Sequence, residues 1–194
     1  SNLAALVNYS ATFAIGFLLS LYLQYIKGFS PRGAGLVLVA QPVVMALFSP
    51  LAGRLSDRME PRVVASMGMA LSAAGLLAFT RLGPASSLPA IIANLMLVGL
   101  GFALFSSPNT NAVMGAVERM QYGVASATLA TMRMVGQMLS MGIATLVFSL
   151  FIGKARIVPA NYPHFLYSMK TSFWIFFVMC VGGVFFSLAR GRVR

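Results

Sequence analysis

The chain has 194 residues, of which 59% are hydrophobic and only 9% are charged, and its mean hydropathy is +0.86. Soluble domains carry about 25% charged residues, so this composition excludes a water-soluble globule and indicates a polytopic membrane protein. A single cysteine and a single histidine exclude a disulfide scaffold and a zinc module. The net charge of +11 comes from basic residues scattered between apolar runs, which is typical of membrane-span flanks and not of a nucleic-acid-binding surface.

Six apolar segments have the length of about 20 residues that crosses a ~30 Å hydrocarbon core as a helix. Backbone polar groups in lipid need internal partners, and the segments lack the alternation of barrel strands, so we expect an all-α membrane protein with six transmembrane helices. The whole chain, 1–194, then forms one six-span unit, with spans at about 3–26, 33–52, 63–80, 88–117, 123–152 and 171–189.

Several features punctuate this pattern. Pro42 and Pro108 lack an N–H group and should interrupt the hydrogen bonding of their helices, the second interruption covering 106–109. A polar stretch at 153–170 separates the last two spans. The chain begins without an initiator Met or a basic leader segment, so we expect it to be part of a larger gene product.

Basic residues predict the orientation of the spans. The loops after the second and fourth spans and the C-terminus share one face, which carries Arg54, Arg58, Arg62, Arg119, Arg190, Arg192 and Arg194. The opposite face has one basic residue fewer and carries Lys27, Arg32, Arg81, Lys154, Arg156 and Lys170. The positive-inside rule therefore favours cytoplasmic termini, by a single charge.

Acidic residues are absent from every span. Asp57, Glu60 and Glu118 are the only ones, and they and His164 lie between spans. Proton-coupled transporters need a membrane-embedded carboxylate or histidine, so this chain alone offers no proton relay. No paired acids, nucleophile motif or phosphate-binding glycine loop indicates an enzyme, and we expect neither a cofactor nor a metal.

Arg133 is the one charged residue inside an apolar segment. It lies about ten residues into its span, roughly 15 Å from the start at 1.5 Å per residue. Ser126, Gln137 and Ser140 share its face at helical spacing, which predicts a polar stripe. A cation at this depth faces a bundle interior or a wet cavity. The alternative is a span that begins below the membrane, with Arg133 reaching the lipid headgroups.

Uncharged polar residues are concentrated on the first, second, fourth and fifth segments, whereas the third and sixth are almost purely apolar. Each alone can serve as hydrogen-bonding glue between helices. Together they predict four helices around a wet path and two outside it. The candidates for this substrate path are Asn8, Thr12, Gln41, Asn109, Asn111, Arg133 and Gln137.

The loop after the second span carries a specific pattern, with Gly53, Arg54, Asp57, Arg58 and Arg62 at fixed spacing. It resembles the loop signature that follows the second span of each six-helix half in the major facilitator superfamily. The family's next Gly-Arg pair is replaced here by Glu-Pro, as in a degraded second-half copy. The resemblance implies a six-helix half-bundle in which Asp57 acts in a conformational latch. The alternative is a solvated determinant of topology.

Two further stretches, 21–30 and 107–127, resemble the fourteen-span drug:proton antiporter branch (EmrB/QacA-like), and the resemblance covers the last six spans of such proteins. It implies one half of a proton-driven exporter in the plasma (inner) membrane. The motif loop and both termini would be cytoplasmic. The implied partners are the missing N-terminal half, a small-molecule substrate, protons and the lipid bilayer. The family's membrane carboxylates lie mainly in earlier spans.

A second hypothesis stays open. The chain can instead be a stand-alone six-span protein that acts as a homodimeric half-transporter or as a channel-like pore, with a second copy as its partner. A membrane scaffold or sensor is a third class, and it would need no polar lining. The reading frame upstream of Ser1 would discriminate between the first two.

Overall fold

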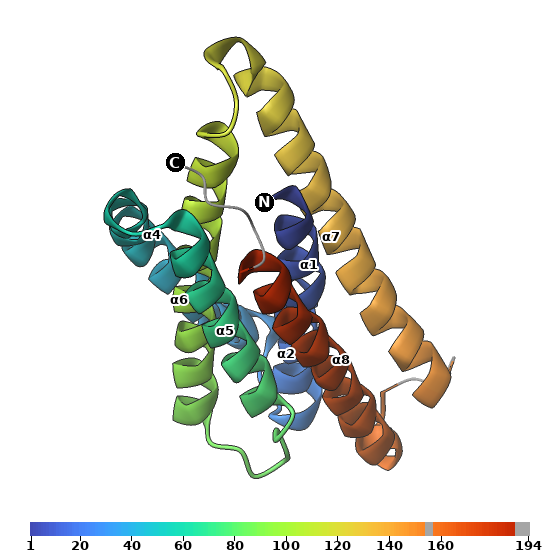
Figure 1. The fold of residues 1–194 in the computed structure, drawn as a ribbon. Helices are drawn as coiled ribbons and strands as arrows, with labels where there is room; N and C mark the ends of the chain where they lie inside the picture. The colour runs from blue at the N-terminus through green and yellow to red at the C-terminus, as the bar shows by residue number, and fades with distance from the viewer. Residues whose placement is uncertain (154–156, 189–194) are drawn as a thin grey trace.

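The computed structural model describes residues 1–153 and 157–188, and every regular element in those residues is helical (Figure 1). Six helical stretches are long and apolar enough to cross a membrane. The expected all-α class with six spans is therefore confirmed. The stretches are Asn2–Ile26, Pro31–Arg58, Pro61–Phe79, Leu88–Met114, Arg119–Phe151 and Pro159–Leu188.

The first stretch is divided near its middle and changes its winding at its end. It consists of α1 (Asn2–Thr12), α2 (Ala14–Leu21) and the π-helical turn η1 (Tyr22–Ile26). At the division, the Ala14 N–H donates to the hydroxyl of Ser140 at 2.9 Å. A side chain of another helix thus supplies an acceptor at the point where the regular helix is interrupted.

The second stretch is divided into α3 (Pro31–Leu38) and α4 (Ala40–Arg58). Pro42 has no N–H to give to the Leu38 carbonyl four residues earlier, and the helix is interrupted at Val39, between the two. The predicted interruption at Pro42 is confirmed. The start of α3 is fixed by Ser30, whose hydroxyl accepts from the Gly33 N–H at 3.1 Å.

The remaining spans are α5 (Pro61–Phe79), α6 (Leu88–Met114), α7 (Tyr122–Phe151) and α8 (Tyr162–Leu188). The 3-10 turns η2 (Arg119–Gln121) and η3 (Pro159–Asn161) precede the last two. Proline occupies the first turn of α3, α5 and α6, where a missing N–H costs no intrahelical bond.

Two sequence expectations about these helices are wrong. The predicted interruption at 106–109 is absent, because α6 continues through Pro108 to Met114. Packing of α6 against α4 and α5 compensates for the one bond that proline removes. The last helix begins at Tyr162 and not at 171. Its first turns are amphipathic, with Phe165 and Met169 fully buried and Tyr167 exposed, so they lack the uniform apolarity of a typical span.

The helices alternate in direction, and α6 packs between α4 and α5 while α8 packs on both α5 and α1. The N-terminus, the turn from α4 to α5 and the loop from α6 to α7 lie at one end of the bundle, as Figure 1 shows. This arrangement agrees with the expected alternation of spans. Of the basic residues used to predict orientation, 154, 156, 190, 192 and 194 lie outside the described residues.

Small residues bring two pairs of helices into close contact. A Cβ atom on Gly68 of α5 would lie 2.6 Å from the Gly101 oxygen of α6, and one on Gly136 of α7 would lie 2.7 Å from the Leu6 oxygen of α1. Glycine at these two positions therefore allows the helix backbones to approach closely. The second contact fixes the position of α7 beside the candidate site.

Candidate functional site

Two pockets open on the face formed by the first, second, fourth and fifth spans. The first, named the serine pocket, has a volume of about 380 Å³ and is lined by Ser49, Ser106, Ser107, Thr110, Asn111, Met114, Ser126, Leu129, Ala130 and Arg133. The second, named the glutamine pocket, measures about 350 Å³ and is lined by Tyr9, Thr12, Phe13, Gly16, Leu38, Gln41, Pro42, Phe102 and Gln137. Neither lining includes a residue of α5 or α8, in agreement with the four-helix path expected from the polar residues.

Arg133 is held between three helices. Its Nη2 donates to the hydroxyl of Thr110 on α6 at 2.8 Å, and its guanidinium carbon lies 5.6 Å from the centre of the Tyr9 ring on α1. The aromatic face stabilises the cation. The Tyr9 ring is in turn fixed edge-on against Phe102 at 5.3 Å. Arg133 therefore lines the serine pocket and is held there by contacts to α1 and α6.

The donors of this guanidinium are largely unused. Its Nε is buried and has no hydrogen-bond partner among the described residues. Thr110 donates its own hydroxyl proton to the Ser106 carbonyl at 2.8 Å, so it can serve Arg133 only as an acceptor. The hydrogen-bond partner of Arg133 among the described residues is thus the neutral hydroxyl of Thr110.

Gln137 lies one turn from Arg133 and lines the glutamine pocket together with Gln41 and Thr12. The Thr12 hydroxyl donates to the Asn8 carbonyl at 2.6 Å, so its proton is used within its own helix. The amides of Gln41 and Gln137 have no hydrogen bond to any described residue. These two amides and the hydroxyl of Tyr9, which also has no hydrogen bond to a described residue, are polar groups of this pocket that can bind a solute or water.

The three asparagines predicted for the path separate into two groups. Asn111 lines the serine pocket and donates to the hydroxyl of Ser56 at 3.0 Å. Asn8 and Asn109 are buried inside the bundle and line neither pocket. Neither amide atom of Asn8 finds a partner within the described residues. The structure thus places three of the predicted path residues on the glutamine pocket and two on the serine pocket, and it separates Asn8 and Asn109 from both.

Residues 53–62, which carry the family motif and are called the motif segment below, are more helical than the expected loop. Gly53 and Arg58 lie within the last turns of α4, and only Met59 and Glu60 separate α4 from α5. Glu60 stands at the N-cap position of α5 and pairs with Arg62. The Glu60–Pro61 pair that replaces the family's Gly-Arg therefore starts α5, with Glu60 at the N-cap and Pro61 at the first helical position, which proline favours.

Two side chains of the motif segment have clear but different environments. Ser56 is buried, and its hydroxyl donates to the Gly53 carbonyl at 2.7 Å while accepting from Asn111, which ties α4 to α6. Asp57 and Arg54 are exposed, and Asp57 makes no ion pair with any described residue. A carboxylate at the C-terminal end of a helix is disfavoured by the helix dipole. The latch function of Asp57 therefore stays a prediction that needs a partner from elsewhere.

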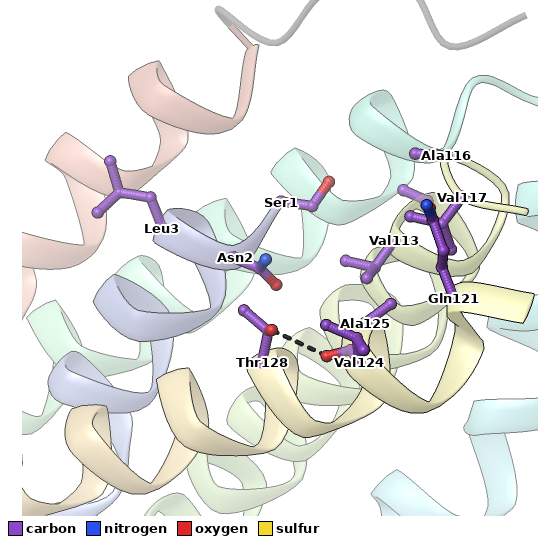
Figure 2. Close-up of a pocket in the computed structure, with 11 residues that line it drawn as sticks. Ser1, Asn2, Leu3, Val113, Ala116, Val117, Gln121, Val124, Ala125 and Thr128 are labelled. Atoms are coloured by element: carbon purple, nitrogen blue, oxygen red, sulfur yellow. Dashed lines mark hydrogen bonds between the residues drawn. The ribbon is translucent and has the colours of Figure 1, made fainter.

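A third and larger pocket, of about 740 Å³, lies where the start of α1 meets the end of α6 and the start of α7. Figure 2 shows its lining, which is mostly apolar and includes Val113, Val117 and Val124. The Thr128 hydroxyl is occupied by the Val124 carbonyl at 2.8 Å. This pocket offers a lipophilic surface next to the first residue of the chain.

Sequence reasoning did not assign Tyr9 or Ser49 to the site. Ser49, Ser106 and Thr110 could have been found as hydroxyls at helical spacing inside apolar spans. Tyr9 carries no such signal, because its role depends on the packing of α1 against α7 at Gly136.

Comparison with known proteins gives the family. The sequence matches the Major Facilitator Superfamily over residues 2–193. The chain belongs to the major facilitator superfamily. It is 29% identical to the riboflavin transporter RibZ of Clostridioides difficile over 187 residues, which are 94% of the chain and 40% of RibZ. It is 33% identical to the transporter YebQ of Escherichia coli over 69% of the chain and 29% of that protein.

The multidrug resistance protein Stp of Mycobacterium tuberculosis is also similar, with 29% identity over 69% of the chain and 25% of its own length. The chain spans 40% or less of each of these three curated relatives. It is therefore a transporter-family membrane protein whose six spans correspond to part of its relatives.

Proposed function

We propose that the chain is the C-terminal six-span half of a proton-driven exporter of drugs or small solutes, of the fourteen-span type. The observation that carries this proposal is the exposure of two of the four spans that line the pockets, the second and the fifth. In the apolar 18-residue window of Pro31–Arg58 only 11% is buried, and in that of Arg119–Phe151 only 22% is buried. The corresponding share for Asn2–Ile26 is 61%. Lipid can cover the apolar faces of these spans, but it would leave the polar groups of the pockets between them unsatisfied, so we infer a protein partner across the path.

The missing N-terminal half is the partner that fits best. The alignment with RibZ covers 40% of that protein, which is nearer to six-fourteenths than to one half. A complete exporter would also supply the membrane carboxylate that proton coupling requires and that this chain lacks, since its three acidic residues lie at helix ends or between helices. The complete protein would lie in the plasma (inner) membrane with the motif segment and both termini in the cytoplasm.

The test is solute-dependent proton flux by the complete protein in everted membrane vesicles, followed with a pH-sensitive dye. The solutes tested include neutral, cationic and anionic members, riboflavin among them. We expect at least one solute to dissipate an imposed proton gradient, and the 194-residue chain expressed alone to give no flux. Flux from the chain alone would instead support the homodimeric half-transporter or pore. No flux from either protein with any solute would refute proton-driven export.

A further inference from the structure

The serine pocket has an unusual balance of polar groups. Its lining contains one cation, Arg133, and the neutral polar residues Ser49, Ser106, Ser107, Thr110, Asn111 and Ser126, but no acidic residue. The three carboxylates of the chain lie at helix ends or between helices, and the ion pair formed within the described residues joins Glu60 to Arg62. The positive charge of Arg133 therefore has no counter-charge in the part of the chain that the structure describes.

The contacts around Arg133 hold the guanidinium in position but use only one of its N–H donors. A guanidinium has five N–H donors in a planar fork, and the contact to Thr110 at 2.8 Å uses one of them. The Tyr9 ring supports the cation from its face, and Nε is buried, so the donors left for a ligand are those of the terminal nitrogens Nη1 and Nη2. Such a fork matches the two oxygens of a carboxylate.

Neighbouring side chains can add donors to the same oxygens. The hydroxyls of Ser106 and Ser107 form no hydrogen bond with the described residues. The Asn111 amide gives one hydrogen to Ser56 and keeps its second. In contrast, the Ser49 hydroxyl is occupied by the Met45 carbonyl at 2.7 Å. The pocket thus offers several neutral donors beside one cation, which is an arrangement suited to an anion.

We propose that the serine pocket binds the carboxylate group of the transported solute, with Arg133 as its bidentate partner and the α6 hydroxyls as additional donors. This inference rests on the proposed function, because it names the substrate class of the same path. A volume of about 380 Å³ is near the lower limit for small-molecule sites, and it suits a carboxylate with an attached ring. The remainder of a larger solute would extend toward the glutamine pocket. A carboxylate from another part of the transporter is the competing source of the same chemistry.

The test is the thermal unfolding of the complete transporter in detergent with benzoate or benzamide, two probes that differ in charge but not in size. Ionic strength is matched with sodium chloride. Saturating benzoate should raise the unfolding temperature by about 2–4 °C, and benzamide should not. Arg133→Gln should abolish the benzoate shift. Thr110→Val, which preserves shape, should reduce it, and it provides the second test if the Gln variant fails to fold. Arg119→Gln, an exposed arginine outside both pockets, should retain the full shift.

The proposal is overturned if benzoate gives no shift with the unmodified transporter, which is the result expected when a carboxylate of the protein already occupies Arg133. It is also overturned if benzamide shifts the unfolding temperature equally, or if Arg133→Gln retains the benzoate effect. The measurement needs no proton gradient. A benzoate shift without solute-driven proton flux would therefore refute the proposed export and leave the carboxylate site standing.

Discussion

Gly136 is a point of close approach between α1 and α7, and a methyl group there should force the two helices apart. A Cβ atom on Gly136 would lie 2.7 Å from the Leu6 oxygen and 2.9 Å from the Tyr9 Cβ. Non-bonded heavy atoms are most favourable near ~3.5 Å, so relieving the shorter of these contacts in Gly136→Ala requires a separation of roughly 0.8 Å. Neither obstacle can rotate away, since one is backbone and the other is bonded directly to it.

Three contributions determine how much Gly136→Ala changes the free energy of unfolding. Overpacking of a tight contact costs about 1–3 kcal/mol. The same separation stretches the bond from the Ala14 N–H to Ser140 Oγ, now 2.9 Å, and its loss costs about 0.5–1.5 kcal/mol. Alanine recovers about 1 kcal/mol of helix propensity over glycine. We expect Gly136→Ala to lower the free energy of unfolding by about 1–3 kcal/mol, which lowers Tm by several degrees.

The assay is thermal unfolding of the complete transporter in detergent, with Gly142→Ala as the matched control. Gly142 lies in the same helix, and a Cβ there would meet nothing within 4 Å, so its alanine variant should keep or raise Tm. Equal Tm values for the two variants would refute the reasoning, because they would show that α1 and α7 do not meet at Gly136.

Four further predictions concern the orientation, the motif segment and, in two variants, the Arg133 cation. Met59 and Ala160 lie at exposed positions and can be replaced by cysteine in a Cys180→Ala background. An impermeant maleimide should label Met59→Cys and Ala160→Cys from opposite sides of the membrane. Labelling of both variants from one side would contradict the topology. Asp57→Asn should impair transport without reducing the amount of transporter in the membrane, and normal transport would remove the latch interpretation. Arg133→Lys should lower transport more than expression because lysine lacks the planar fork. Arg133→Gln should also move the pH profile of transport to higher pH, because a cation depresses the pKa of a carboxylate that the complete transporter brings near it without pairing with it; an unchanged profile would show that no titrating carboxylate of the protein lies near Arg133.

Hydropathy predicted the number of spans and most of their positions, because a membrane helix must be apolar along a length set by the bilayer. It failed where that condition does not apply. The first turns of α8 bury Phe165 and Met169 but also carry polar residues, so their helicity depends on packing rather than uniform apolarity. Pro108 was expected to interrupt α6, but a proline removes a single bond and the contacts of α6 on both sides preserve the helix.

The candidate site was predictable to the extent that polar residues in apolar spans are rare. That rule selected Arg133, Gln137 and Gln41, and all three line the two pockets. It also selected Asn8, which is fully buried in the bundle, because the rule gives no direction around the helix axis. The partner of Arg133 followed from neither composition nor spacing, since Thr110 lies on another helix and reaches it only through the packing of α7 beside α6.

The outer faces of α4 and α7 set the limit of sequence reasoning. An apolar side chain that faces lipid and one that faces another protein segment both contribute equally to hydropathy. Exposed Leu47 and Leu51 on α4 and exposed Met138 on α7 are therefore indistinguishable from lipid-facing residues in the sequence. The structure adds the information that separates them, because these helices border pockets that contain a cation and several amides and hydroxyls. A polar pocket open to hydrocarbon would leave those groups unsatisfied at a cost of several kcal/mol each, so the adjoining apolar faces are expected to pack against protein.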